Sequence, residues 1–144
     1  MGNEQLKTLV PLLGRGGVAV VANATSVLQA DVRERPTHLV DTLLALGVNV
    51  RKVFAPEHGL RGDAANGTHI EDGHAPRTGL PIVSLHGDRR KPRPEDLADV
   101  RTIVFDIQDV GARFYTYLST LALVMEAAAE AGAAVVILDR PNPH

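Results

Sequence analysis

Five short apolar runs are separated by polar and helical segments along the chain. They cover residues 17–22, 48–55, 80–85, 100–107 and 133–139. Four of them are rich in Val and Ile and alternate only weakly between apolar and polar positions. This pattern is typical of strands that are buried on both faces of a parallel sheet. The sequence therefore predicts five strands at the centre of the fold.

Helical patterns lie before the first run and between several of the others. Residues 35–47, RPTHLVDTLLALG, have Pro36 suited to a first helical turn and Gly47 suited to a stop. Residues 113–132 repeat apolar positions at three- and four-residue steps and end at Gly132. The stretch around TLVPLLG, next to Lys7, favours a first helix over a signal peptide, because Arg15 interrupts the apolar run.

Strands that alternate with helices predict an α/β fold. We expect a three-layer, Rossmann-like open sheet, mainly parallel, of about five strands with flanking helices. A chain of 144 residues suits one domain, so the domain is expected to cover residues 1–144. Residues 56–79 and 86–94 fit neither period. A loop as long as 56–79 is usually functional or disordered, or it contains structure that the pattern does not show.

Composition excludes several classes of function. The net charge of −2 and the absence of a basic stripe argue against a nucleic-acid partner. The chain has no cysteine, which excludes disulfides and thiolate chemistry. No apolar run is long enough for a membrane span, since a spanning helix needs about 20 apolar residues. Without a convincing signal peptide, a cytoplasmic location is expected for the chain as it stands.

Polar side chains follow all five predicted strands. Since parallel strands place their carboxyl ends at one edge, these residues should converge on one site. The alternative is that loops are simply polar: Glu57 would cap a turn and Asp109 would form one. The candidates are Asn23 and Thr25 after the first strand, Glu57 and His58 after the second, His86 after the third, Asp106, Gln108 and Asp109 at the fourth, and Asp139, Arg140 and Asn142 after the fifth.

The sequence lacks the common motifs for dinucleotide binding, serine hydrolysis and metal binding at these positions. No Gly-x-Gly-x-x-Gly follows the first strand, and Gly14–Gly17 precede it, so a dinucleotide site is disfavoured. There is also no Gly-x-Ser-x-Gly elbow for a serine hydrolase. The cluster at residues 71–74, EDGH, matches no strong metal signature. We therefore expect neither a cofactor nor a metal.

Five motifs in order resemble one family. FAPEHGLRGDAANG, TGLPIVSLHG, KPRPEDL, VFDIQDVGARFYTYLSTL and VVILDRPNP are similar to those of the DUF1343 (YbbC-like) family, the NamZ-type exo-β-N-acetylmuramidases. The resemblance runs from about Val18 to Pro143. It implies a Rossmann-like N-terminal domain that acts with a C-terminal one, and release of N-acetylmuramic acid from the non-reducing end of peptidoglycan fragments. Family members are longer, and this chain has Ala22 where they commonly have Thr.

The resemblance also suggests roles. Glycoside hydrolysis normally uses two carboxyl groups, and Glu57, beside His58, is the candidate general acid. The second carboxylate could be Asp106, Asp109 or a residue of the absent portion, or the acetamido group of the substrate could act instead. A retaining, an inverting and a substrate-assisted mechanism all remain open. The lactyl carboxylate of the sugar could be bound by Arg61, Arg113 or Arg140, of which Arg113 is ranked first. Tyr115 is the candidate for stacking on a sugar face.

Two other functions are kept as alternatives. The chain could be a non-catalytic, sugar-binding half-site that needs a C-terminal domain or an oligomer partner. A phosphosugar- or nucleotide-binding domain ranks last, because the loops after the strands supply acids, which repel phosphate. The expected ligand is a saccharide or muropeptide that contains muramic acid.

Overall fold

The computed structural model describes residues 2–28, 35–56, 60, 72–111 and 116–141. Its main sheet has the strand order β5-β6-β4-β1-β7-β8, and β2 (Val27–Leu28) pairs with β3 (Thr37–His38) in a separate small sheet. The main strands are β1 (Val18–Ala22), β4 (Val50–Ala55), β5 (Gly73–His74), β6 (Pro81–Ser84), β7 (Thr102–Asp106) and β8 (Ala134–Ile137). In the main sheet, as far as it is described, β5–β6 is the one antiparallel pair and the four other pairs are parallel. The predicted α/β open sheet is confirmed.

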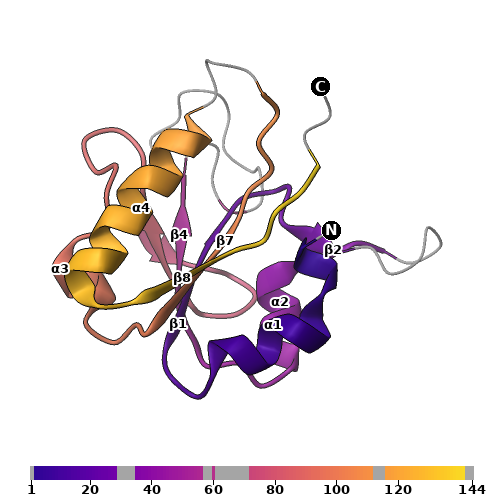
Figure 1. Cartoon of the computed structure of the whole chain (residues 1–144). Coiled ribbons are helices and arrows are strands. Elements are labelled where there is room, and N and C mark those ends of the chain that lie inside the picture. Colours follow the sequence, from indigo (N-terminus) through magenta and orange to yellow (C-terminus); the bar gives the residue numbers. More distant parts are fainter. Residues whose placement is uncertain (1, 29–34, 57–59, 61–71, 112–115, 142–144) are drawn as a thin grey trace.

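Helices cover both faces of this sheet, which gives three layers (Figure 1). On one face, α1 (Leu6–Leu13) and α2 (Leu39–Ala45) pack their leucines against alternate residues of β1, β4 and β7. On the other face, α3 (Pro94–Leu97) and α4 (Tyr117–Ala131) pack against the remaining alternate residues. The buried apolar residues of β1 and β7 therefore divide between two cores, as a period of two requires.

The central strands are the most deeply buried part of the molecule. Every residue of β1 and β7 is buried, which explains why their sequences alternate so weakly. The edge strand β8 is different, since Ala134 and Ile137 are exposed and the two residues between them are half-buried. All five predicted strands are present, with ends that differ from the predicted ranges by no more than two residues.

The helix ends follow the predicted signals in one case and not in another. Gly132 ends α4 in the left-handed conformation, with φ of 67°, as predicted. Pro36, by contrast, does not lie in the first turn of α2. Residues Thr37–His38 form β3, and the helix begins only at Leu39. The prediction was wrong because His38, an unusual cap, accepts a hydrogen bond from the Val40 amide through its ring.

The sequence did not reveal the shortest elements. These are η1 (Gly2–Glu4), β2 (Val27–Leu28), β3 (Thr37–His38), β5 and α3. Two-residue pairings are too short to have a hydrophobic period. The single turn of α3 begins at Pro94, and the Asp96 carboxylate accepts a hydrogen bond from the Arg93 amide. The short strand β5 therefore lies within the stretch 56–79, whereas residues 86–93 contain no helix or strand and α3 begins only at residue 94.

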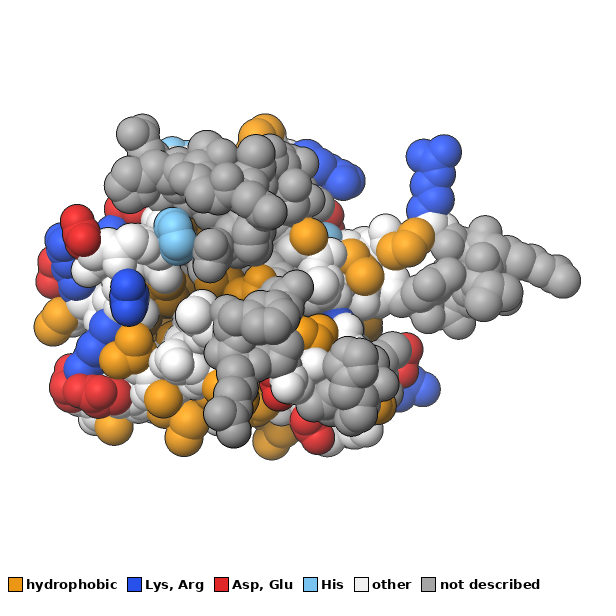
Figure 2. All heavy atoms as spheres, turned by 90° about the horizontal axis from the view of Figure 1, so that it is seen from above, with side chains coloured by type: hydrophobic (Ala, Val, Ile, Leu, Met, Phe, Trp, Pro, Cys, Tyr) orange, Lys and Arg blue, Asp and Glu red, His pale blue; other side chains and the backbone are white. Residues whose placement is uncertain are grey.

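The carboxyl ends of the parallel strands point upward in Figure 1 and toward the viewer in Figure 2. Acidic and basic side chains are interspersed on the α3–α4 side of this view, and no single basic surface stands out there (Figure 2). Among the described residues, no helix is long and apolar enough to cross a membrane.

Candidate active site

At the carboxyl edge of the sheet, the last paired residues of four neighbouring strands are two alanines with a buried polar residue on either side. Parallel register pairs Ala22 of β1 with Asp106 of β7, and Ala55 of β4 with Ser84 of β6. The pairing of β1 with β4 places the two alanines side by side. All four residues are at most 6% exposed. Their side chains lie on the face that α1 and α2 cover, because side chains alternate along a strand.

Asp106 is held by an arginine from the loop after β8. Arg140 donates from Nε and Nη2 to Oδ1 of Asp106, at 2.9 and 2.6 Å. Its Nη1 donates to the carbonyl oxygen of Thr25 at 2.6 Å. The Arg140 side chain is only 6% exposed and that of Asp106 is fully buried. Three candidates from three different strand ends are thus joined, as the convergence of polar loops predicted.

The second oxygen of Asp106 is unusual. Oδ2 is buried and has no hydrogen-bond partner within the described part of the chain. Burial raises the pKa of Asp106 above its ordinary value, while the charge and hydrogen bonds of Arg140 act in the opposite direction. One oxygen of the carboxyl group is therefore hydrogen-bonded to Arg140, while the other is removed from solvent.

The turn after β1 is closed by its own side chains. Oδ1 of Asn23 accepts hydrogen bonds from the Thr25 amide at 2.9 Å and from the Thr25 hydroxyl at 2.7 Å. The Asn23 amide donates to the Ser26 hydroxyl at 3.0 Å, and that hydroxyl donates to the carbonyl oxygen of Asp106. Asn23 is 5% exposed and Ser26 is fully buried. Asn23 and Thr25 therefore build the turn and connect it to β7.

His38 connects this turn to α2. Because its Nδ1 accepts from the Val40 amide, the proton of the neutral ring lies on Nε2. That nitrogen lies 3.0 Å from the carbonyl oxygen of Asn23, to which it donates. The ring is buried. One imidazole thus fixes the start of α2 to the end of β1.

Four further candidates lie at the same edge with fewer contacts. Gln108 donates from Nε2 to the carbonyl oxygen of Pro141 at 3.3 Å, which joins the loops after β7 and β8. Asp109 accepts from the Gly111 amide at 3.2 Å, as a turn-forming aspartate does. Asp139 is exposed, and its backbone carbonyl accepts from the Gly2 amide. His86, at the end of β6, is half-buried.

His86 lines a cavity of about 210 Å³ between the end of β6 and the start of α4. Gly87, Arg90, Thr116 and Ser119 also line it. The remaining candidates, Glu57, His58, Arg61, Arg113, Tyr115 and Asn142, lie outside the described residues. Among the described residues, no three potential metal ligands come together.

A sequence profile of the family described as exo-β-N-acetylmuramidase NamZ, N-terminal, matches residues 18–144. The chain belongs to this family. It is also similar to the peptidoglycan β-N-acetylmuramidase NamZ of Bacillus subtilis strain 168, with 50% identity over 97 residues. That match covers 67% of this chain and 23% of the Bacillus protein. The chain thus matches about a quarter of that relative.

Two solved structures of DUF1343 family proteins from Bacteroides fragilis have the same fold. One is 41% identical, with a TM-score of 0.81, and the match covers 99% of this chain and 34% of that protein. The other is 37% identical, with a TM-score of 0.80, and the coverage is 99% and 35%. The family identified from the five sequence motifs is therefore confirmed, and the chain corresponds to a third of each solved relative.

Sequence reasoning missed several residues that build this edge. Ser26 and His38 carry no motif signal, because a serine in a turn and a histidine before a helix are common. Ser84 ends an apolar strand, and its hydroxyl is buried without a partner in the described part of the chain. Pairing with the next strand in register would have placed Ser84 at the edge, since β4 and β6 end together.

Proposed function

We propose that this chain is the catalytic N-terminal domain of an exo-β-N-acetylmuramidase, which releases N-acetylmuramic acid from the non-reducing end of peptidoglycan fragments. The observation that carries the proposal is the family match over residues 18–144. The geometry adds support, because polar groups from β1, β7 and the loop after β8 meet at the carboxyl edge. Open α/β sheets bind their ligands at this edge.

Glu57 is proposed as the general acid. It follows Pro56, which is buried, and β4 ends just before it with Phe54 and Ala55 fully buried. A general acid must be protonated near neutral pH, and an apolar setting favours this form because it disfavours the charged one. A protonated carboxyl group can donate to the glycosidic oxygen as the bond breaks.

Asp106 is proposed as a positioning residue. One of its oxygens already accepts two hydrogen bonds from Arg140, and the side chain is fully buried. A nucleophile or base must reach the sugar or a water molecule, and this carboxyl group is fully buried. The backbone carbonyl of Asp106 binds Ser26 of the turn after β1. The role of Asp106 would be to hold Arg140 and that turn in place beneath the substrate.

The second catalytic group is then Asp109, a carboxylate from the remaining portion of a longer protein, or the acetamido group of the substrate. Asp109 is half-buried at the carboxyl edge and is bound only by the Gly111 amide among the described residues. It keeps lone pairs for a water molecule. Asp109 is therefore the first residue to test within this chain.

The test uses a chimaera in which residues 1–144 replace the matching segment of the Bacillus relative. The chimaera should release the chromophore from a chromogenic β-N-acetylmuramide, and Glu57→Gln should lower this rate by orders of magnitude. The matched control is Glu95→Gln, an exposed glutamate on α3. Both variants should unfold at the same urea concentration as the parent chimaera.

Near-parental turnover by Glu57→Gln would remove this residue from the acid role. The 144-residue chain alone should be tested in the same assay. Binding of N-acetylmuramic acid without turnover, in both proteins, would favour a non-catalytic half-site. This second function is supported by coverage, because the chain matches only 23% of the Bacillus enzyme.

A further inference from the structure

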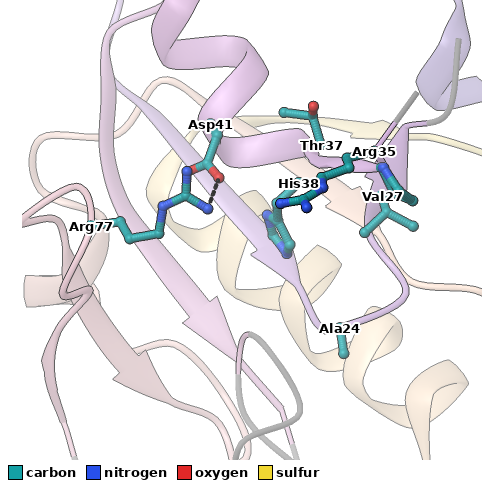
Figure 3. A pocket seen from close by; sticks show the side chains of 8 residues that line it. Ala24, Val27, Arg35, Thr37, His38, Asp41 and Arg77 are labelled. Atoms are coloured by element: carbon teal, nitrogen blue, oxygen red, sulfur yellow. Dashed lines mark ion pairs between the residues drawn. The ribbon is translucent and has the colours of Figure 1, made fainter. Parts of the chain in front are cut away.

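A cavity of about 400 Å³ lies beside α2, and its lining includes neither Asp106 nor Arg140. Its walls come from the turn after β1, the β2–β3 strands, the first turn of α2 and the loop between β5 and β6. Figure 3 shows Arg35 and His38 on one side, and Arg77 reaching in from the other side toward Asp41. The lining residues are Ala24, Val27, Arg35, Pro36, Thr37, His38, Asp41 and Arg77.

The two arginines of this cavity make few interactions with the described residues. Arg35 makes no hydrogen bond or ion pair within the described part of the chain. Arg77 has one partner there, Asp41, whose carboxylate oxygen lies 3.7 Å from Nη1, beyond hydrogen-bond distance. Two guanidinium groups thus face one carboxylate. The cavity lining is cationic, although the whole chain carries a net charge of −2.

Arg140, by contrast, is held by structural partners, which bind three of its five N–H groups. Its Nε, Nη1 and Nη2 already donate to Asp106 and to the Thr25 carbonyl oxygen. Moving it would leave the Asp106 carboxylate buried and unpaired, which is strongly unfavourable. Of the three arginines that the sequence suggested for a lactyl carboxylate, Arg140 is the one within the described residues, and its side chain already binds Asp106 and Thr25.

The cavity is anchored to the candidate active site. His38, which lines it, lies 3.0 Å from the carbonyl oxygen of Asn23. The Leu39 amide, at the start of α2, donates to the carbonyl oxygen of Ser26 at 2.8 Å. A ligand group held in the cavity would consequently have a fixed position relative to the turn that Arg140 and Asp106 support.

We propose that this cavity binds the carboxylate of an acidic amino sugar, with Arg35 and Arg77 as its partners and the Thr37 hydroxyl as a further donor. The inference rests on the proposed function and identifies the subsite that distinguishes N-acetylmuramic acid from N-acetylglucosamine, which lacks the lactyl group. Guanidinium groups recognise carboxylates through paired, charge-assisted hydrogen bonds. The volume is within the range of small-molecule sites, about 300–1,000 Å³.

The experiment measures binding by calorimetry, independently of turnover. N-acetylmuramic acid and N-acetylglucosamine are titrated into the 144-residue chain, into the double variant Arg35→Ala/Arg77→Ala and into Arg15→Ala. Arg15 is an exposed arginine before β1 and lies outside the cavity lining. It is the control for simple loss of positive charge. Circular dichroism checks that each variant is folded.

The wild-type chain should bind N-acetylmuramic acid at least about tenfold more tightly than N-acetylglucosamine, as expected for one charge-assisted pair. The double variant should lose this preference, and Arg15→Ala should keep it. Raising the salt concentration should weaken the binding of the acidic sugar and leave that of N-acetylglucosamine unchanged. A preference that survives in the double variant would overturn the proposal. So would equal binding of both sugars by wild type, no binding of either, or competition by inorganic phosphate as strong as that by the sugar.

Failure of this inference can be told apart from failure of the proposed function. If the chimaera hydrolyses muramides and the double variant keeps its preference for them over glucosaminides, the active site stands and the carboxylate subsite is wrong. If binding behaves as expected but Glu57→Gln leaves turnover unchanged, the subsite stands and the proposed acid is wrong.

Discussion

Arg140 donates two hydrogen bonds to the same oxygen of Asp106, and the other oxygen of that carboxylate is buried without a partner in the described residues. The pair joins the last residue of β7 to the loop after β8, and through Thr25 it also joins the turn after β1. A charge placed in this way stabilises the fold only while its partner is present, since an unpaired buried charge is costly.

Arg140→Met should therefore lower the free energy of unfolding by about 3 kcal/mol, because it leaves Asp106 buried and unpaired. The double variant Asp106→Asn/Arg140→Met should recover part of this loss, since the buried charge is then removed as well. Urea unfolding followed by circular dichroism is the suitable measurement, because the chain has no tryptophan. If the effects of the two substitutions simply add, the pair is not coupled.

The raised pKa of Asp106 gives a second expectation, on pH. In the folded state this carboxyl group holds its proton above the ordinary value of 3.8, because of burial. The native state then binds more protons than the unfolded state between 3.8 and the raised pKa. Its contribution to stability is present below 3.8 and is lost as the pH rises through the folded pKa.

Comparison of wild type with Asp106→Asn isolates this contribution. The free energy of unfolding of wild type, relative to that of the variant, should fall as the pH rises from about 3.8 toward neutrality. Asp72 and Asp99 have lowered pKa values, and they act in the opposite direction in both proteins, so their effect cancels. A difference that rises with pH would mean that Arg140 outweighs burial.

Much of the fold could be predicted from the sequence, because its signals are local. Buried parallel strands show as Val- and Ile-rich runs, and the end of α4 shows as Gly132. Parallel strands share a carboxyl edge, so the meeting of Thr25, Asp106 and Arg140 could also be expected. The five motifs were sufficient to identify the family.

The actual contacts at that edge could not be predicted. Asp106 and Arg140 both looked like residues for the substrate, but their side chains bind each other. Nothing in the sequence shows whether a polar group after a strand turns toward solvent or toward another loop, because this depends on the register of neighbouring strands. For the same reason Ser26 and His38 were missed, although both support the turn after β1.

Arg89 joins the two segments that fit neither the helical nor the strand period. Its Nη1 donates to Asp72 at 2.6 Å, and Nη2 donates to both oxygens of Asp96 at 2.6 and 2.7 Å. Asp72 in turn accepts from the Ser84 amide at the end of β6. This backbone bond is the main cause of the lowered pKa of Asp72, and Arg89 adds to it. The network fixes the start of α3 to the end of β6.

Arg89→Met should lower the free energy of unfolding by about 2 kcal/mol, since Asp96 is buried and loses a charged partner. The methionine keeps most of the apolar stem, so packing changes little. Arg90→Met is the matched control, because Arg90 is exposed and, among the described residues, its guanidinium binds only the Gly87 carbonyl oxygen. Equal urea midpoints for the two variants would contradict a structural role for Arg89.

The turn after β1 supplies the last prediction, which separates stability from positioning. Asn23→Ala removes the acceptor of both Thr25 bonds, whereas Thr25→Val removes only the hydroxyl and keeps the amide bond. We expect Asn23→Ala to lower the free energy of unfolding by about 1–2 kcal/mol, and Thr25→Val by less. Circular dichroism during urea unfolding gives both values.

The same two variants can be measured in the chimaera with the Bacillus relative. If the turn positions Arg140 and the groups around it, Asn23→Ala should lower kcat for the chromogenic muramide far more than Thr25→Val does, at a temperature where both remain folded. The Thr25 carbonyl oxygen that Arg140 binds is backbone and is kept in both variants. Because only its position changes, equal kcat values would mean that the turn stabilises the fold without contributing to catalysis.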